Sequence, residues 1–166
     1  MYNGRMQNIL DPLTLDIICR LGVALLLGMC LGVERVWAHK TAGIRTYALV
    51  SMGAALFVSI SEVIAKMYSL DAGFDPSRIA SQIVVGVGFI GAGLIFTKDS
   101  KLVGITTATG LWVSAGIGMA AGFGLYNIAI IATILTLFVF VVLWFLEERL
   151  KKSRLYQNQT LDDNSQ

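Results

Sequence analysis

The charged side chains that interrupt the apolar sequence are the residues of this chain that could do chemistry. Asp16 and Arg20 lie within the first apolar segment, and Glu34 and Arg35 stand at its end. Asp16 and Arg20 are four residues apart, so on a helix they share one face and can pair. Glu34 follows Arg20 by about four helical turns and returns to a similar face. Because an ionised side chain in a bilayer costs at least about 2.5 kcal/mol and turns toward protein or trapped water, these residues predict a buried polar seam.

The seam continues into the next apolar segment, which opens with Arg45 and Thr46. We expect Glu34 to pair with Arg35, with Arg45 or with a cation of another helix. Such a pair would fix the adjoining ends of the first two segments, because each charge would neutralise the other.

A second interpretation of Arg20 stays open. This residue lies about 10 Å inside the membrane at 1.5 Å per residue, which is close enough for its side chain to snorkel to the headgroups. Glu62 lies near the far end of the second segment and is expected at the membrane interface.

Carboxylates are also the ligands that Mg²⁺ would use, but the apolar sequence contains few of them. Mg²⁺ gives up water reluctantly and prefers several oxygen ligands. Asp16 and Glu34 lie at opposite ends of one segment, so a site that used both would need two subunits or backbone carbonyls. The sequence therefore predicts no cofactor, and Mg²⁺ at Asp16 or Glu34 is the one metal hypothesis.

No residue pattern indicates catalysis or nucleic-acid binding. His39 is the only histidine, lies in a basic connection and has no nucleophile motif near it, so we expect it to be solvated. Gly86, Gly88 and Gly91 match G-x-G-x-x-G, but a dinucleotide site also needs an acid about 20 residues later, where this sequence reads GLWVS. The basic residues lie in short connections beside apolar segments. We therefore expect neither an enzyme nor a nucleic-acid partner.

Small residues recur at helical spacing in two segments. When they occupy every fourth position, two membrane helices can approach until their backbones touch, within one chain or between chains. The third segment, GVGFIGAGLIF, is denser in glycine than packing requires, so we expect it to unwind locally as a hinge or filter. The helix-packing residues are Gly28, Gly32, Gly110, Ser114, Gly118 and Gly122, and the hinge or filter residues are Gly86, Gly88, Gly91 and Gly93.

The elements that must position these residues are membrane-spanning helices. The chain has 166 residues, of which 55% are hydrophobic and 14% charged, with a mean hydropathy of +0.70, whereas a soluble domain is about 25% charged. A spanning helix needs roughly 20 apolar residues. The sequence therefore predicts an all-α integral membrane protein with five transmembrane helices. The five segments are Leu13–Val33, Thr46–Lys66, Ile79–Phe96, Thr107–Gly122 and Tyr126–Leu146.

The distribution of Lys and Arg predicts the orientation. Nine of them lie in the connections 34–45 and 97–106 and in the tail after 146, and three lie on the other side. Cytoplasmic connections carry such an excess, so we expect the N-terminus outside and the C-terminus in the cytoplasm. The fourth segment is short and rich in glycine, which leaves a re-entrant hairpin as its alternative, but a hairpin would move the basic tail outside.

The chain is accordingly divided into three parts. Residues 1–12 form an extracytoplasmic segment, 13–146 the five-helix transmembrane domain, and 147–166 a short cytoplasmic tail that is expected to be disordered after 156. No cleavable signal sequence is expected, because the first apolar run contains Arg20 and no A-x-A site follows it. Cys19 and Cys30 match no metal spacing and are expected to be small apolar fillers.

Three blocks of the sequence resemble, in order, the signature of the MgtC/SapB family of bacterial inner-membrane proteins. LGVERVWAHKTAGIRTYALVSMGAALF (31–57) is similar to the family's G-x-E-R followed by A-G-L-R-T-H-x-L-V-x-x-G-A-x-L-F, and VGFIGAGLIF (87–96) to its G-F-L-G-A-G-x-I. VGITTATGLWVSAGIGMAAG (103–122) is similar to V-x-G-L-T-T-A-A-x-L-W-x-x-A-x-I-G. The third block carries the family-motif residues Gly104, Thr106, Thr107 and Trp112.

A few positions depart from the family pattern. Tyr47 stands where histidine is usual, and Gly110 stands where alanine is common; Ile44 and Ile105 replace leucine. The chain also stops after the membrane domain, so any function of the soluble C-terminal domain that some members carry is not expected here.

The resemblance implies a multi-pass protein of the bacterial inner membrane with five helices, linked to growth at low magnesium and, in some pathogens, to virulence. It leaves two activities open. One is regulation of other membrane proteins through helix contacts, the proton-driven ATP synthase among them. The other is transport of Mg²⁺ or another cation by an oligomer. The expected partners are the lipid bilayer, further copies of the chain in a homodimer or other homo-oligomer, and another inner-membrane complex.

Overall fold

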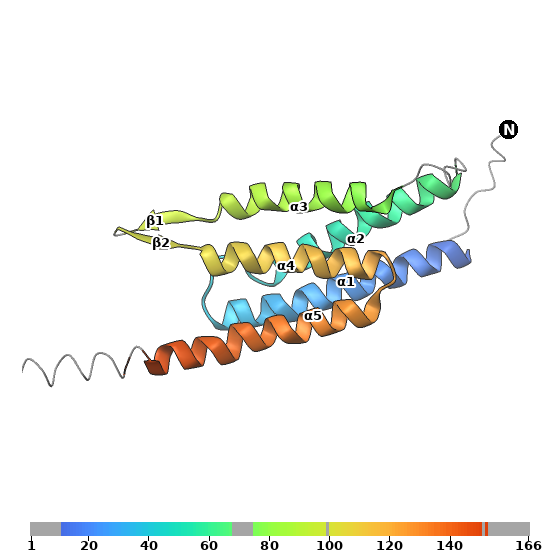
Figure 1. Ribbon diagram of the computed structural model, residues 1–166. Helices are drawn as coiled ribbons and strands as arrows, with labels where there is room; N and C mark the ends of the chain where they lie inside the picture. Colours follow the sequence, from blue (N-terminus) through green and yellow to red (C-terminus); the bar gives the residue numbers. More distant parts are fainter. Residues whose placement is uncertain (1–10, 68–74, 99, 151, 153–166) are drawn as a thin grey trace, which may run out of the picture.

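The chain folds as a bundle of long helices that run alternately up and down (Figure 1). A computed structural model describes residues 11–67, 75–98, 100–150 and 152. Each of the five apolar segments corresponds to one helix, as the sequence predicts. The elements are α1 (Pro12–Trp37), α2 (Ile44–Met67), α3 (Pro76–Ala92), β1 (Phe96–Lys98), β2 (Lys101–Val103), α4 (Ile105–Gly122), α5 (Tyr126–Phe138) and the π-helical turn η1 (Val139–Leu143).

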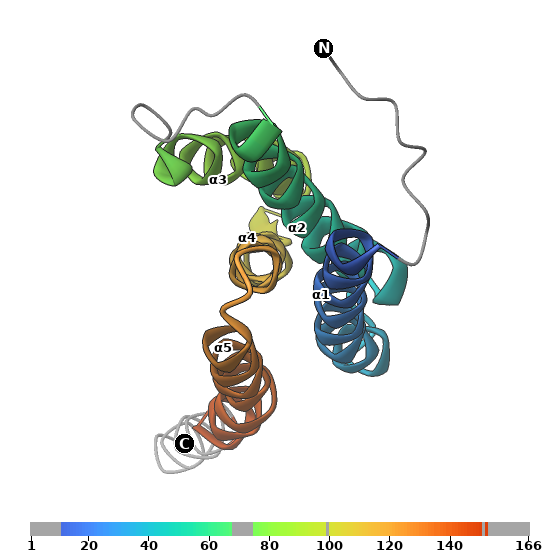
Figure 2. The same cartoon turned by 90° about the vertical axis from the view of Figure 1, so that its right-hand side faces the viewer.

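α4 is the centre of the bundle. It contacts each of the other four helices, and α3 and α5 lie on opposite sides of it when the bundle is viewed end-on (Figure 2). Ten of its residues are buried, from Thr107 to Gly122. α4 is one uninterrupted helix of 18 residues, about 27 Å long at 1.5 Å per residue. The alternative of a re-entrant hairpin for this segment is therefore wrong.

The helices suit a membrane environment. Among the described residues, three helices are long and apolar enough to cross a bilayer, namely Pro12–Trp37, Ile44–Met67 and Tyr126–Leu150. α3 is apolar but shorter. α4 is rich in Gly, Ala, Ser and Thr because its neighbours are other helices, which it meets through small residues. The fold is therefore that of an all-helical membrane protein.

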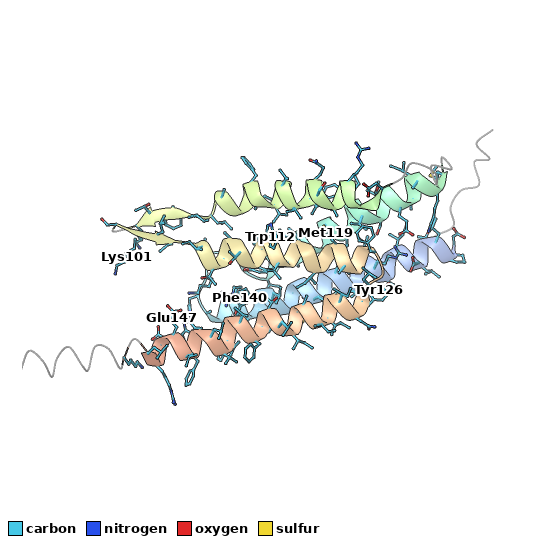
Figure 3. All side chains as sticks on the ribbon, in the orientation of Figure 1. Lys101, Trp112, Met119, Tyr126, Phe140 and Glu147 are labelled. Carbon is cyan, nitrogen blue, oxygen red and sulfur yellow. The ribbon has the colours of Figure 1, made fainter. Side chains whose placement is uncertain are left out.

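The connection between α3 and α4 differs from the prediction. The third apolar segment is predicted to reach Phe96, but α3 ends at Ala92, and Phe96 begins an antiparallel β-hairpin that pairs it with Val103. The hairpin projects beyond the helix ends, with Lys101 near its tip (Figures 1 and 3). Strands of three residues are too short to produce a periodic hydrophobic pattern, so the sequence does not predict this hairpin.

Gly104 explains how the chain returns from the hairpin into α4. Its φ is +92°, in the left-handed region that favours glycine, and a Cβ there would overlap the carbonyl group of Leu94. The family-motif glycine therefore serves the turn that places α4. The predicted segment 1–12 and the predicted disorder after 156 fall, except for Asp11 and Pro12, outside the described residues.

Candidate functional site

The polar residues gather in two clusters at opposite ends of the bundle. We call them the Arg20 cluster (Asp16, Arg20, Glu62, Lys66 and the Gly122 carbonyl) and the Arg35 cluster (Glu34, Arg35, Tyr47, Thr107 and Phe140). α1 contributes an arginine to both. Along α1, Asp16 of the first cluster and Glu34 of the second are eighteen residues apart, which corresponds to about 27 Å at 1.5 Å per residue.

In the Arg20 cluster one guanidinium joins three helices. Nη2 of Arg20 lies 2.7 Å from Oδ2 of Asp16, so the pair that the i,i+4 spacing predicts is confirmed. Nη1 pairs with Glu62 of α2 and donates to the carbonyl oxygen of Gly122 at 2.8 Å. The side chain of Arg20 is 15% exposed. It is turned into the bundle, and its partners are protein groups.

The Gly122 contact has an electrostatic reason. Gly122 is the last residue of α4, and the last carbonyls of a helix have no partner within the helix and carry partial negative charge. The Arg20 cation therefore caps α4 and holds its end against α1 and α2. Glu62, for which the sequence predicts a place at the membrane interface, pairs with Arg20 of α1 and with Lys66 one turn later on α2.

In the Arg35 cluster a cation is almost fully enclosed. The Arg35 side chain is 3% exposed and forms an ion pair with the neighbouring Glu34, which is 11% exposed. The guanidinium carbon of Arg35 lies 3.5 Å from the centroid of the Phe140 ring, where the negative face of the ring attracts a cation. Phe140 is buried in η1 of α5 and points from α5 toward the other helices (Figure 3). The cluster thus joins α1 to α5.

Tyr47 extends this cluster to α2 and α4. It is fully buried, and its hydroxyl donates to the carbonyl oxygen of Thr107 at 3.3 Å. A Cβ built on Gly110 would overlap that hydroxyl and lie 2.7 Å from Cζ of Phe140. The phenol and the ring therefore occupy space that only a glycine at position 110 leaves free.

Buried serines lie between the clusters. Ser51 of α2 donates to the carbonyl oxygen of Ala24 at 2.7 Å, and Ser114 of α4 donates to the carbonyl oxygen of Tyr47 at 3.0 Å. Both hydroxyls are satisfied by backbone groups of neighbouring helices. The predicted polar seam is thus two charged clusters separated by a neutral, hydrogen-bonded interior.

The predicted packing glycines act within the chain. A Cβ on Gly28 would lie 2.7 Å from the Tyr47 carbonyl oxygen, and one on Gly122 would lie 2.9 Å from the Ala55 backbone. A Cβ on Gly32 or Gly118 would overlap the backbone of α2. α2 therefore packs backbone to backbone against α1 on one side and α4 on the other.

The glycines of the third segment behave differently. α3 is a regular helix through Gly86, Gly88 and Gly91, so the local unwinding expected for this segment is wrong there. The chain leaves the helix only at Gly93, whose N–H still donates to the Phe89 carbonyl. Of these four glycines, only Gly91 would bring a Cβ into contact with another helix, at an ordinary 3.6 Å from Ala108 of α4. A Cβ on Gly86 or Gly88 would meet nothing within 4 Å.

The remaining predicted residues lie at the surface or beside the clusters. Arg45 is exposed at the start of α2, next to the half-buried Thr46. Of the cations predicted to pair with Glu34, Arg35 forms the ion pair. Trp112 is 52% exposed, and Thr106 and His39 are exposed as well. Cys19 and Cys30 are free and exposed, and their role as small apolar fillers stays a prediction.

Sequence reasoning missed Glu62, Tyr47 and Phe140 as members of the clusters. Glu62 is a carboxylate within the second apolar segment, and that isolation is a signal for an internal partner. Tyr47 is marked by its departure from the family pattern. Nothing in the sequence distinguishes Phe140 from the other apolar residues of α5, because cation–π pairing depends on how two helices pack.

Comparison with known proteins identifies the chain's relatives. It is 44% identical over 151 residues to the Escherichia coli (strain K12) protein named "Putative magnesium transporter YhiD", an alignment that covers 90% of this chain and 70% of that protein. It is 46% identical over 120 residues to "Protein MgtC" of Salmonella typhimurium (strain LT2) and 43% identical over 123 residues to "Protein MgtC" of Brucella abortus. These alignments cover 72% and 74% of this chain and 49% of each MgtC protein.

No solved structure gives a significant match. The sequence model described as "MgtC family" matches residues 21–149, which confirms the resemblance carried by the three sequence blocks. None of the relatives named above carries the name of an enzyme. The match covers α2, α3, α4 and α5 completely and α1 from residue 21 onward. The chain therefore belongs to the MgtC family and is a multi-pass protein of the inner membrane.

Proposed function

We propose that this protein crosses the inner membrane five times and regulates another membrane protein, under magnesium limitation, through direct helix contacts. The observation that carries the proposal is the outer face of α3. Val85 and Phe89 are 68% and 84% exposed there, and Gly88 beside them has open space in place of a side chain. Among the described residues of this helix, only Ile83, Val87 and Gly91 are buried.

The presence of glycine at position 88, inside a helix and with no neighbour that requires it, needs an explanation. Glycine destabilises a helix interior by about 1 kcal/mol relative to alanine. At Gly28 and Gly118 the close approach of α2 offsets this loss of helix stability. Gly88 has no such neighbour in its own chain. Beside the large Phe89 it forms a notch on a convex helix face, and such a notch suits the backbone of a further membrane helix. That helix would belong to a second copy in a homo-oligomer or to a different inner-membrane complex.

The charge distribution supports the proposed orientation. The α1–α2 connection, the hairpin and the end of α5 lie together at the Arg35 end of the bundle (Figure 1). They carry the basic regions that the positive-inside rule assigns to the cytoplasm. The Arg20 end, where α3 begins, would then face outward.

The charged clusters support regulation over conduction. Asp16 and Glu62 pair with Arg20, and Glu34 pairs with Arg35. With about 27 Å between Asp16 and Glu34, one Mg²⁺ cannot bind both in a single protomer. Among the residues that the structure describes, no three His, Cys, Asp or Glu side chains gather as metal ligands.

Two measurements on the full chain test the proposal. The tagged protein is isolated in mild detergent and its co-purifying membrane proteins are identified. We expect Gly88→Leu to lose them and Gly22→Leu, at an equally open glycine of α1, to retain them. Equal recovery with both variants would contradict the proposal.

Cation transport is the alternative, and one observation favours it. The buried serines Ser51 and Ser114 lie between the two clusters, where polar groups would line a path. Vesicles that contain the purified protein and a Mg²⁺-sensitive dye decide between the two. Mg²⁺ flux that Glu34→Gln abolishes would establish transport, and no flux together with a Gly88-dependent complex would support regulation.

A further inference from the structure

We infer that the groove between α2 and α3 binds one membrane phospholipid, with its acyl chains along the helices and its phosphate at Arg78. The inference does not depend on the proposed function. The groove has a volume of about 1460 Å³, which exceeds the roughly 300–1,000 Å³ of most small-molecule pockets. The groove therefore has room for a molecule larger than a typical metabolite.

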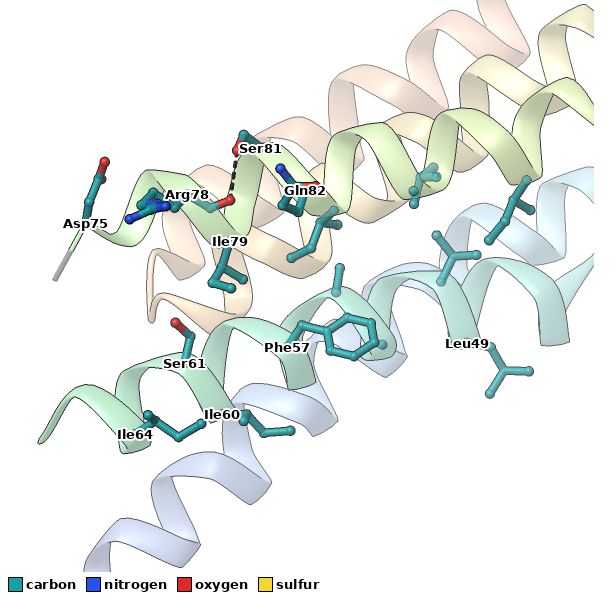
Figure 4. A pocket seen from close by; sticks show the side chains of 17 residues that line it. Leu49, Phe57, Ile60, Ser61, Ile64, Asp75, Arg78, Ile79, Ser81 and Gln82 are labelled. Atoms are coloured by element: carbon teal, nitrogen blue, oxygen red, sulfur yellow. Dashed lines mark hydrogen bonds between the residues drawn. The ribbon is translucent and has the colours of Figure 1, made fainter. Parts of the chain in front are cut away.

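The lining of the groove changes character along its length (Figure 4). Over most of its length the walls are apolar, with Leu49 and Phe57 from α2 and Val87 and Ile90 from α3. Polar side chains are concentrated at the Arg20 end, where α2 finishes and α3 begins. These polar residues are Ser61, Asp75, Arg78, Ser81 and Gln82. An occupant that matches both parts is a long apolar molecule with a polar head.

Arg78 is the cation at the polar end of the groove, an end that the Asp75 carboxylate also lines. It is the third residue of α3 and is exposed at the groove. In the first turn of an apolar helix, this position would lie at the depth of the headgroups of a bilayer. A guanidinium binds phosphate through parallel N–H donors. Ser81, one turn later, directs its own hydroxyl to the Arg78 carbonyl at 2.8 Å. Gln82 also lines the groove, and its side-chain amide can act as a neutral donor.

The length of the groove favours a lipid over a helix. From Arg78 to Ile90 the groove runs about 18 Å along α3 at 1.5 Å per residue, which is close to one leaflet of a bilayer whose hydrocarbon core is about 30 Å thick. A partner helix would cross both leaflets. Flexible acyl chains fit such a slot within one leaflet, whereas a spanning helix would extend beyond it.

Two glycines keep the slot open. Gly53 of α2 and Gly86 of α3 both line the groove, and a Cβ on either would meet nothing within 4 Å. Neither allows a close approach of another helix in the chain. At their positions a side chain would extend into the space assigned to the acyl chains, without striking the protein.

These glycines give a sharp experiment. The full-length protein and a Gly53→Leu/Gly86→Leu variant are purified in mild detergent, and retained phospholipid is counted by native mass spectrometry. We expect one phospholipid on each wild-type protomer and at least a tenfold lower occupancy in the variant. Gly88→Leu, also at an open glycine of α3 but outside the groove, is the matched control and is expected to retain the lipid. Far-ultraviolet circular dichroism verifies that all three are folded.

A second comparison tests the phosphate contact. Phosphatidylglycerol and diacylglycerol with the same acyl chains are titrated against wild-type protein and Arg78→Gln. We expect Arg78→Gln to weaken phosphatidylglycerol about tenfold and to leave diacylglycerol unchanged, and Lys66→Gln, at the same end but outside the groove, to change neither. The inference is overturned if the filled-groove variant retains as much lipid as wild type. It is equally overturned if leucine at 53 and 86 changes the oligomeric state instead, since the groove would then seat a second copy.

Discussion

Gly110 lies against the hydroxyl of Tyr47, in the space that a side chain at position 110 would occupy. The two residues meet within the Arg35 cluster. These are also two of the positions at which the chain departs from its family pattern. A larger residue stands at position 47, where histidine is usual, and a smaller one at position 110, where alanine is common. The phenol gains the volume that the methyl group gives up, so the two departures compensate each other.

Gly110→Ala is therefore expected to destabilise the protein, and Tyr47→His to relieve the effect. The added methyl group would overlap the Tyr47 hydroxyl and press on Phe140, at a cost of about 1–3 kcal/mol for an overpacked core. Thermal unfolding of the two single variants and the double variant in detergent measures the coupling. Gly116→Ala, at an open position of the same helix, is the control and should be neutral or stabilising. Strictly additive effects at 47 and 110 would show that the two positions are independent.

Glu34→Ala is expected to lower the stability of the protein more than removal of both members of the ion pair. The substitution leaves the Arg35 cation 3% exposed and without its carboxylate, which in buried pairs costs about 3–5 kcal/mol. A Glu34→Ala/Arg35→Met variant removes both charges and should recover part of the loss. Unfolding midpoints in detergent compare the three proteins. Wild-type stability of Glu34→Ala would refute the structural role of this pair.

Arg20→Met is expected to loosen the contact of α4 with α1 and α2. It removes the donor to the Gly122 carbonyl and leaves Glu62 with one cation fewer, so we expect a loss of about 3 kcal/mol, the scale of a broken buried pair. Lys66→Met removes the other partner of Glu62, but this side chain is 61% exposed and should contribute less than about 1 kcal/mol. Hydrogen exchange at the end of α4 reports on the cap directly. Similar exchange in both variants would contradict a capping role for Arg20.

Gly118→Ala is expected to destabilise the monomer fold and not an interface between copies. A Cβ at 118 would overlap the backbone carbonyl of Ser51, and backbone cannot move aside as a side chain does, so we expect about 3 kcal/mol or more. Gly22→Ala, where the space is open, should gain up to about 1 kcal/mol in helix propensity. Unfolding and size-exclusion profiles are recorded together. If Gly118→Ala changed the oligomeric state without lowering the stability, the close contact at Gly118 would lie between chains and not within one chain.

Several features could be predicted from the sequence because they depend on local composition and spacing. The extent of α1, α2, α4 and α5 follows from the length of apolar runs, since hydrocarbon admits only hydrogen-bonded helices of sufficient length. The Asp16–Arg20 pair follows from i,i+4 spacing on one helix. The family follows from three ordered blocks of sequence.

Other features depend on which helices become neighbours, and only the tertiary structure decides them. The partnership of Arg20 with Glu62 joins residues 42 apart, and that of Arg35 with Phe140 joins α1 to α5. Neither leaves a periodic trace in the chain. The same holds for glycines: Gly118 and Gly88 look alike in sequence, but one lies against the backbone of α2 and the other faces open space. Spacing determines the face of a helix on which a residue lies, whereas packing determines what that face meets.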